Sequence, residues 1–433
     1  MRSVVSIRYA VLVTIFLLLP AGLVRAQQPV KLDPTSFVVI GEGLAAGMGN
    51  FGLNTAVQSY SFPALAAQQM KTAFAQPLIE GPGFADVLGY PAQPVRLPTY
   101  PATQTRIFPP QPNPNDDAPT LFVFNISVPG MKLADAVSRR PVSPLIHQDN
   151  MQQTVINMIL GFPSLILDKD VPLWSQYEYA VAMNPTMVLV ELGYYEALDA
   201  AVNADPSRVP DAAAFQTTYA NIVKGLRSLQ AQVILTTIPD PSDTAYFTIG
   251  PTALNILRCT PLVLYAGYGI KPTDYVTRNG LTTIGYQLFS KKIGPVPAGT
   301  FASPDMLAAV RTRVNALNTA INNVAKDNNA VVYDLNGFLH RVRTSGAKAG
   351  SYSLTADYFG GFYTLDGFYP SPTGHALIAN DLLALLNKTY SISIPAVDVA
   401  SIAATDATVQ QKLATGSIFA LSSNGTLAAE TEP

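Results

Sequence analysis

The sequence predicts an α/β fold in which a mostly parallel β-sheet is covered by helices on both faces. Three observations support this prediction. Short apolar segments rich in β-branched residues recur along the chain, amphipathic helical patterns lie between them, and several of the apolar segments stop at a glycine or a proline. In sheets of this class ligands bind at the carboxyl ends of the strands, so the loops that follow the strands are the expected place of function.

Four segments have the pattern of buried parallel strands, and three long segments have apolar residues at helical spacing. The expected strands are residues 36–40, 186–192, 232–238 and 330–335. The expected helices are residues 212–229, 305–324 and 374–386. Because parallel strands point the same way, we expect the loops at Gly41, Gly193 and Asp366 to converge.

The chain begins with the pattern of a secretory signal peptide. Arg2 and Arg8 precede or flank an apolar run over residues 9–19, and residues 24–26 offer small side chains at the two positions that a signal peptidase reads. We therefore expect residues 1–26 to be cleaved and the protein to be secreted or periplasmic. An uncleaved anchor is the alternative, although the apolar run is short for a membrane span. No stable membrane insertion is expected after cleavage.

The balance of basic and acidic residues limits the classes of binding partner that the sequence suggests. Removal of residues 1–26 takes away three arginines and no acidic residue, which leaves 24 basic against 29 acidic groups and a formal charge of −5. No basic patch is evident in the sequence, which argues against nucleic acid or an anionic membrane as a partner. Cys259 is the single cysteine and there are three histidines, so neither a disulfide nor a His/Cys zinc site is expected. No cofactor is expected.

The domain organisation follows from composition. Residues 27–395 are long enough for one large α/β domain. A proline-rich insertion is expected at residues 85–118, since eight prolines between residues 91 and 114 oppose regular structure. The tail, residues 396–433, is rich in alanine and threonine and predicts a weak helix followed by a frayed end.

Four loops carry short motifs, and two of these loops directly follow predicted strands. The motifs are Gly41-Glu42-Gly43-Leu44, Asn125-Ile126-Ser127-Val128-Pro129-Gly130, Gly193-Tyr194-Tyr195-Glu196 and Asp366-Gly367-Phe368-Tyr369. In this order the motifs resemble the four sequence blocks of the SGNH/GDSL hydrolase (lipase/esterase) family. The resemblance runs from about residue 36 to residue 390. It implies a three-layer α/β/α sandwich with a flavodoxin-like parallel sheet.

The resemblance also implies a reaction, and the sequence departs from it. In this family a serine attacks an ester carbonyl, a histidine accepts its proton, and an aspartate orients the histidine. The matching positions hold Gly43 for the serine, Tyr369 for the histidine and Asp366 for the aspartate. The oxyanion hole would use the backbone of Gly130 and an asparagine that is here Tyr195. With serine, asparagine and histidine all replaced, we expect a catalytically inactive pseudo-hydrolase.

An inactive site still offers groups that can bind a ligand. Aromatic rings beside carboxylates suit a sugar ring or another flat small molecule. The candidate ligand-pocket residues are Glu42, Gly43, Tyr194, Tyr195, Glu196, Phe368 and Tyr369. The alternative is that several of these aromatic rings fill the vacated catalytic cleft and make it rigid.

Other functions remain open at this point. An altered ester hydrolase would need an unconventional nucleophile or base; Ser36, Ser127 and His375 are weak candidates. A second alternative is a glycosidase in which Glu42, Glu196 and Asp366 supply the acid and the base; the more common role for such acids is to cap a loop or helix or to face solvent. The glycines from Gly41 to Gly47 are spaced one residue too long for the common dinucleotide-binding turn. His147 has no strand-end context, and His340 is expected to be a packing residue.

Overall fold

The protein is described by a computed structural model that covers residues 31–79, 106–107, 123–161, 164–167 and 172–412. The chain separates into two compact units, residues 1–31 and 32–433, and the helices and strands named below all belong to the second. The predicted signal peptide lies outside the described residues. So does the proline-rich insertion, apart from residues 106–107.

A parallel sheet of four strands forms the centre of the second unit. The strands β1 (Phe37–Gly41), β4 (Met187–Glu191), β5 (Gln232–Thr236) and β9 (Val331–Tyr333) lie in the order β1-β4-β5-β9. All neighbouring strands are parallel, with Phe37 opposite Met187 and Met187 opposite Gln232. β1, β4 and β5 are buried along their whole length, as expected for strands covered on both faces. All four strands predicted from the sequence are confirmed.

Residues 124–128 extend the sheet beyond β1, which the sequence did not predict. The backbone N–H of Val39 donates to the carbonyl of Phe124 (2.9 Å), and that of Ile126 donates to the carbonyl of Val39 (3.0 Å). The N–H of Val128 then donates to the carbonyl of Gly41 (3.0 Å). This alternation is the hydrogen-bond pattern of parallel pairing. The segment therefore brings its own loop, with Gly130, to the same edge of the sheet as the loop after β1.

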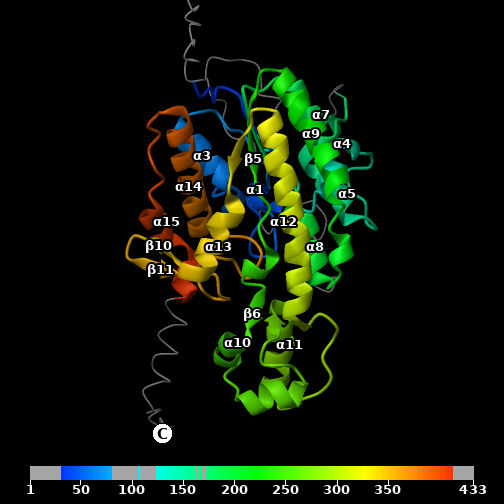
Figure 1. The fold of residues 1–433 in the computed structure, drawn as a ribbon, viewed down its shortest axis with the longest axis vertical. Helices are drawn as coiled ribbons and strands as arrows, with labels where there is room; N and C mark the ends of the chain where they lie inside the picture. The colour runs from blue at the N-terminus through cyan, green and yellow to red at the C-terminus, as the bar shows by residue number, and fades with distance from the viewer. Residues whose placement is uncertain (1–30, 80–105, 108–122, 162–163, 168–171, 413–433) are drawn as a thin grey trace, which may run out of the picture. The chain divides into compact units, whose positions relative to one another are not determined.

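Helices cover the sheet on both sides. α3 (Phe62–Met70) packs against α14 (Pro372–Tyr390), and α9 (Ala212–Ser228) packs against α12 (Pro304–Asp327). Figure 1 shows the first pair on one side of β5 and the second pair on the other. The three predicted helices are confirmed, each a few residues longer or shorter than expected. The chain thus has a mixed α/β fold with a parallel sheet.

Side-chain caps fix where the long helices begin. The Asp211 side chain accepts hydrogen bonds from two backbone N–H groups at the start of α9. The side chains of Ser303 and Ser371 each accept one such hydrogen bond, at the starts of α12 and α14. Proline at the first turn of α12 and α14 costs no hydrogen bond there, because the first N–H groups of a helix have no partner within it. These caps explain helix starts that apolar periodicity alone located only approximately.

The tail is more firmly held than the sequence suggested. The expected helix is present as α15 (Val399–Thr405), and it packs on α14. Asp406 accepts hydrogen bonds from the backbone N–H (2.9 Å) and the hydroxyl (2.7 Å) of Thr373, in the first turn of α14. Residues 413–433 lie outside the described part of the chain.

Residues 245–302 form a lobe that the sequence analysis did not anticipate. It contains a small antiparallel sheet of β6 (Phe247–Ile249), β7 (Tyr275–Thr277) and β8 (Phe301–Ala302), with α10 (Gly250–Leu257), a π-helical turn (Leu262–Ala266) and α11 (Arg278–Phe289). It has a hydrophobic cluster of its own, made of Ala253, Leu264, Ile270, Val276, Leu281 and Ile284. Figure 1 shows the lobe beyond the amino-terminal end of α12.

The remaining elements are short. They are α1 (Gly43–Ala46), α2 (Thr55–Gln58), α4 (Leu133–Ser138), α5 (Met151–Leu160), α6 (Ser164–Leu167), α7 (Gln176–Ala182), α8 (Tyr194–Val202), α13 (Leu335–Ser345), the pair β2 (Leu78–Ile79) with β3 (Arg106–Ile107), and the hairpin β10 (Ala347–Ala349) with β11 (Tyr352–Leu354). Within the described residues no helix combines the length and the apolar character that crossing a membrane requires.

Candidate active site

The loops after β1 and β4 meet the loop of residues 362–371, as predicted. The hydroxyl of Tyr369 donates a hydrogen bond to Oε2 of Glu42 across 3.1 Å. The hydroxyl of Tyr194 donates to the carbonyl of Phe368 across 3.0 Å. Side chains from three distant parts of the chain therefore contact one another at the carboxyl edge of the sheet.

Tyr369 occupies the space that a side chain at position 43 would need. A β-carbon built on Gly43 would lie 2.6 Å from the Tyr369 hydroxyl oxygen and 2.8 Å from its Cζ atom. Real β-carbons do not approach other heavy atoms this closely. The ring of Tyr369 is itself held in place, because Tyr194 packs edge-on against it with the ring centroids 6.4 Å apart. Glycine at 43 and tyrosine at 369 are therefore a matched pair.

Glu42 ties the same two elements together. Its Oε1 atom accepts a hydrogen bond from the N–H of Leu44 (2.7 Å), which caps the start of α1, while Oε2 receives the Tyr369 hydroxyl. The side chain is fully buried, and burial raises the pKa of this carboxyl to about 7, because the charged form has lost its hydration. Glu42 is thus a structural carboxyl that links α1 to Tyr369.

A second buried carboxylate lies directly beneath it. Glu191, the last residue of β4, accepts hydrogen bonds from the backbone N–H of Glu42 (3.1 Å) and of Ala45 (3.2 Å). Burial, followed by the nearby charge of Glu42, raises the pKa of Glu191 well above its usual range. Glu191 was not among the residues predicted from the sequence, because it ends an apolar strand and belongs to none of the four motifs.

Asp366 holds its own loop together. One carboxylate oxygen accepts hydrogen bonds from the backbone N–H groups of Phe368 (2.8 Å) and Tyr369 (3.0 Å), and the other accepts from the Thr364 hydroxyl (2.7 Å). Burial raises its pKa above the ordinary value. The aspartate thus fixes the turn that carries Tyr369. This is the loop-capping role that was the favoured interpretation of Asp366 from the sequence.

The aromatic side chains of these loops pack against each other. Phe368 stacks on Tyr246 with the ring centroids 4.3 Å apart. Tyr194, Phe368 and Tyr369 each expose at most 4% of their surface. Among the described residues the arrangement therefore matches the alternative in which aromatic rings fill the vacated cleft. A ligand that enters between Glu42, Tyr194 and Tyr369 would have to displace them.

The remaining candidate residues are Tyr195, Glu196 and Gly130. Tyr195 is half-buried, and the ammonium of Lys132 lies 5.8 Å from the centroid of its ring. Glu196 accepts the N–H of Leu133 (2.7 Å), its other oxygen is buried without a hydrogen bond, and burial raises its pKa to about 7. Gly130 has φ +76°, a conformation that favours glycine, in the turn after residues 124–128.

A hollow of about 200 Å³ opens beside Glu196. It is lined by Lys132, Leu133, Ala134, Glu196, Arg208, Pro210, Ala214, Phe215 and Thr218. Lys132 and Arg208 each form an ion pair with Asp199 at 2.9 Å. Of these residues only Glu196 was a candidate from the sequence, because the walls of the hollow come from three separate segments. Unlike the cluster around Tyr369, it is open to a small molecule from outside.

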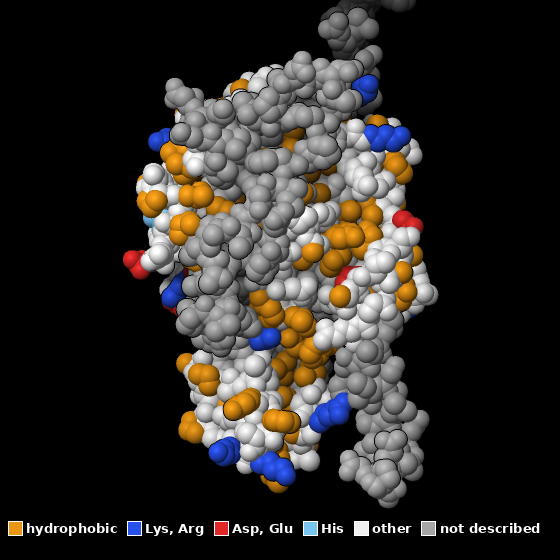
Figure 2. Space-filling view, turned by 180° about the vertical axis from the view of Figure 1, so that it is seen from behind, with side chains coloured by type: hydrophobic (Ala, Val, Ile, Leu, Met, Phe, Trp, Pro, Cys, Tyr) orange, Lys and Arg blue, Asp and Glu red, His pale blue; other side chains and the backbone are white. Residues whose placement is uncertain are grey.

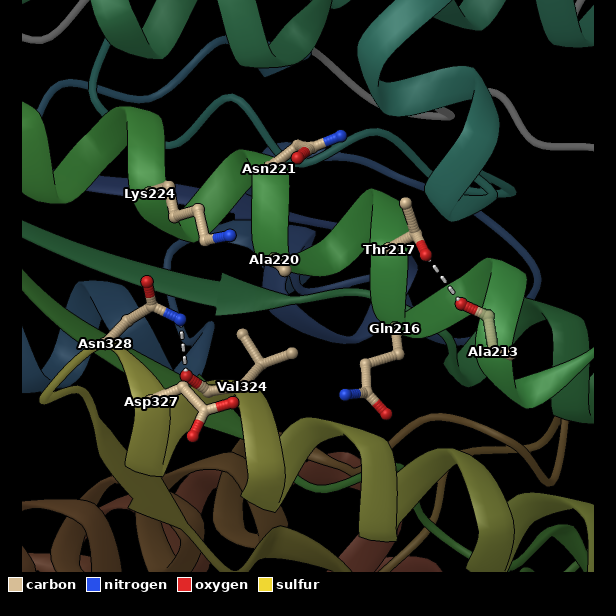
Figure 3. Close-up of a pocket in the computed structure, with 9 residues that line it drawn as sticks. All are labelled: Ala213, Gln216, Thr217, Ala220, Asn221, Lys224, Val324, Asp327 and Asn328. Atoms are coloured by element: carbon tan, nitrogen blue, oxygen red, sulfur yellow. Dashed lines mark hydrogen bonds between the residues drawn. The ribbon is translucent and has the colours of Figure 1, made fainter.

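A larger hollow of about 420 Å³ lies between α9 and α12, away from the candidate residues (Figure 3). It is lined by Ala213, Gln216, Thr217, Ala220, Asn221, Lys224, Val324, Asp327 and Asn328. Two of the polar groups are engaged with helix backbone: the Thr217 hydroxyl donates to the carbonyl of Ala213, and the Asn328 amide donates to that of Val324. None of the candidate site residues lines it.

The residues considered for other chemistries are poorly placed for it. Both ring nitrogens of His375 are buried without a hydrogen-bond partner, and burial lowers its pKa to about 3, so the ring stays neutral inside α14. The Ser127 hydroxyl is also buried and unpartnered, whereas Ser36 lies at the entrance of β1. At the start of α1 the Glu42 carboxyl takes the position that a phosphate would need in a dinucleotide-binding turn.

The expectation for His340 was wrong. Its side chain is 61% exposed, and its Nδ1 atom lies 2.9 Å from a carboxylate oxygen of Asp243. His147 contacts the carbonyl of Val142 through Nε2 at 3.0 Å. Across the described ranges, no group of three or more histidine, cysteine or acidic side chains is arranged to hold a metal ion.

Comparisons with known proteins give distant likenesses. A scan against protein-family models and a search of curated proteins found no match. Among solved structures, TesA is similar at 14% identity over 82% of this chain and 98% of that chain, with a TM-score of 0.34. The psychrotrophic esterase EstA from Pseudoalteromonas sp., in a structure inhibited by monoethylphosphonate, is similar at 13% identity over 82% and 100%, also with a TM-score of 0.34. Membership of the SGNH/GDSL family therefore stays a proposal.

Proposed function

We propose that this chain is an exported protein of the SGNH/GDSL hydrolase fold that binds a ligand or partner and does not hydrolyse esters. The proposed fold is a three-layer α/β/α sandwich. When residues 124–128 are counted as the second strand in chain order, the spatial order is 2-1-3-4-5, as in flavodoxin-like sheets. The order of the four sequence motifs and the meeting of their loops support the family assignment.

One observation carries the proposal that the site is inactive: position 43 has no room for a nucleophile. The 2.6 Å approach between a β-carbon on Gly43 and the Tyr369 hydroxyl means that serine at 43 and tyrosine at 369 exclude each other. The chain has therefore replaced the nucleophile and the base by two residues that fit together. Loss of such groups in serine hydrolases typically lowers turnover by about 10⁴ to 10⁶.

No residue of the loop replaces the missing base. Burial and the nearby charge of Glu42 raise the pKa of Tyr369 well above its ordinary value, so the phenol keeps its proton and donates it to Glu42 in a hydrogen bond. The carboxylate of Asp366 is occupied by backbone N–H groups. The strand-end cluster is thus a rigid core and not a reaction centre.

A ligand can reach this edge of the sheet from the outer side. Tyr195 offers a half-buried aromatic ring, and Lys132 and Arg208 bring two cations to the hollow, whose wall also includes the buried Glu196. Such a combination suits a saccharide or a small carboxylate. We therefore propose this outer surface, and not the space between Glu42 and Tyr369, as the ligand site.

The proposal is tested by measuring hydrolysis and binding on the same purified chain, residues 27–433. We expect p-nitrophenyl acetate to be hydrolysed at the buffer rate, both by the wild type and by Gly43→Ser. We expect at least one member of a panel of saccharides and small carboxylates to raise the unfolding temperature, and Tyr195→Ala to abolish that shift. Turnover above the buffer rate would refute the first part, and indifference to the whole panel would refute the second.

Two further preparations complete the test. The triple variant Gly43→Ser, Tyr195→Asn, Tyr369→His restores the family residues and removes the clash; its turnover shows whether the rest of the pocket has kept its geometry. N-terminal sequencing of the protein recovered outside the cytoplasm checks export, with cleavage after Ala26 expected.

A further inference from the structure

The lobe of residues 245–302 exposes large apolar side chains to solvent. Phe289 is 88% exposed, Leu262 75% and Tyr286 72%, and Ile249 and Ile293 are also exposed. Among the described residues, the only other large hydrophobic side chain so exposed is Val142, in the main body of the unit. Exposure of this kind concentrated in one part of a molecule marks an interaction surface.

These side chains are presented by a folded scaffold. Tyr286 and Phe289 lie on the outer face of α11, while Leu281 and Ile284 on its inner face join the lobe's own hydrophobic cluster. Leu262 begins the π-helical turn whose Leu264 is fully buried in the same cluster. The lobe therefore has a packed core of its own, and these apolar side chains are exposed on the surface of a folded unit.

The same lobe has a charge opposite to that of the rest of the chain. Residues 245–302 contain five basic residues and one acidic residue, whereas the full chain has a formal charge of −2. Arg258, Lys271, Lys291 and Lys292 are exposed, and the single carboxylate, Asp274, is half-buried. In Figure 2 the face shown of this lower part carries orange and blue side chains and no red. The patch is not evident in the sequence, because its basic residues are spread between positions 258 and 292.

From this combination we infer that the lobe docks onto the surface of an anionic lipid bilayer through α11 and the residues that follow it. Phe289 and Ile293 bracket Lys291 and Lys292, so apolar side chains can enter the interface while the ammonium groups stay at the level of the lipid phosphates. A basic residue close to an anionic membrane surface strengthens binding. This attraction decays over about one Debye length from the surface, so the residue must lie close to the lipid headgroups.

Other occupants fit the surface less well. A second copy packed face to face would bring two positive lobes together, which like-charge repulsion opposes. A nucleic acid would pair with the lysines but would leave Phe289, Leu262 and Tyr286 without an apolar partner. A bilayer surface satisfies both kinds of side chain. Peripheral docking of this kind requires no membrane-spanning helix.

Vesicle co-sedimentation of the chain of residues 27–433 tests the inference. We expect binding to phosphatidylcholine vesicles that contain about one-third phosphatidylglycerol, weak binding to pure phosphatidylcholine, and release by added salt. The double charge reversal Lys291→Glu with Lys292→Glu should weaken binding by about tenfold or more. Phe289→Ser should weaken it by about tenfold, since the serine removes the apolar group that enters the interface.

Matched controls use exposed residues outside the lobe. Lys326→Glu with Lys388→Glu makes the same change of charge, and Val142→Ser removes an exposed apolar side chain; both should bind within about twofold of the wild type. Equal binding to the two kinds of vesicle, or equal loss in the controls, would overturn the inference. It would also be overturned if the wild type were dimeric in solution and Phe289→Ser monomeric, because the surface would then serve self-association.

Discussion

At the scale of single residues, the buried cluster is organised around the side chain of Tyr369. Tyr369 fills the volume beside Gly43, donates to Glu42, and is held by Tyr194 and by the Asp366 loop. Each of these contacts uses a residue in or next to one of the four sequence motifs. The motif residues thus form one buried cluster that contributes to stability.

A double-mutant cycle measures the fit between Gly43 and Tyr369. Gly43→Ala should lower the free energy of unfolding by about 1–3 kcal/mol, because its β-carbon meets the tyrosine ring. Tyr369→Ala should cost about 3–5 kcal/mol through the cavity it leaves. Because the β-carbon at position 43 meets no ring once Tyr369 is alanine, the free energy of unfolding of the double variant should fall by at least about 1 kcal/mol less than the sum of the two single losses. Chemical denaturation of the four proteins gives these values.

Gly285→Ala is the control for that cycle. A β-carbon there would meet only Leu257 Cδ2, at an ordinary 3.7 Å, inside α11. Alanine should therefore raise the free energy of unfolding by about 0.5–1 kcal/mol through its higher helix propensity. Strict additivity of the Gly43 and Tyr369 changes would show that the two side-chain positions do not compete for the same space.

The buried carboxyl of Glu42 predicts a pH dependence of stability. Its pKa is raised from 4.5 to about 7, so the folded protein holds this proton at pH values where the unfolded chain has released it. The free energy of unfolding is then highest below pH 4.5 and falls as the pH rises to 7, by up to about 3 kcal/mol for this group. Glu42→Gln should match the wild type at pH 4 and exceed its stability by about 2–3 kcal/mol at pH 8.

Glu178→Gln is a control of opposite sign. The hydrogen bond from Arg140 lowers the pKa of Glu178 to about 2. This carboxylate therefore stabilises the fold at pH values above the pKa of Glu178 in the unfolded chain, and the stabilisation is lost as the pH falls toward 2. Its glutamine variant should therefore be less stable than the wild type at neutral pH, with the deficit shrinking in acid. A Glu42→Gln difference that does not change with pH would show that the pKa of Glu42 is not raised in the folded state.

At the scale of elements, the sequence predicted those with a strong pattern. Strands such as 187–191 are long, apolar and β-branched, and helices such as 212–228 repeat apolar residues through several turns. In residues 124–128, Asn125 and Ser127 interrupt the apolar run that a buried strand normally has. The pairing of this segment with β1 was therefore not predicted. The lobe was missed because its strands have two or three residues and its segments are interrupted by glycine and proline.

The same reasoning explains what was and was not predicted at the candidate site. Glu42 and Tyr194 follow predicted parallel strands. Their loops were therefore expected to meet the loop of Tyr369, because parallel strands end at one edge of the sheet. The sequence could not tell that Tyr194 enters the cluster while Tyr195 turns toward Lys132, since neighbouring residues on a helix point about 100° apart and the helix orientation comes from tertiary packing. It also could not reveal that the rings close the cleft, because that depends on volume.

At the scale of the whole chain, two features lie in different places. The closed strand-end cluster lies at the carboxyl edge of the parallel sheet, and the apolar, basic surface lies on the lobe of residues 245–302. The lobe contacts the cluster through Tyr246, which stacks on Phe368, and through Arg278, which donates to the carbonyl of Leu365. The loop that carries Tyr369 is thus supported by contacts from the lobe.

The central claim is that no serine of this chain acts as an ester-hydrolysing nucleophile. The most direct test is the intact mass of the purified chain of residues 27–433 after incubation with a serine-reactive phosphonate, beside an active serine esterase as positive control. We predict an unchanged mass, because Gly43 carries no hydroxyl and the Ser127 hydroxyl is buried. A stoichiometric phosphonate adduct, mapped by peptide sequencing to one serine, would contradict the account and would identify the nucleophile.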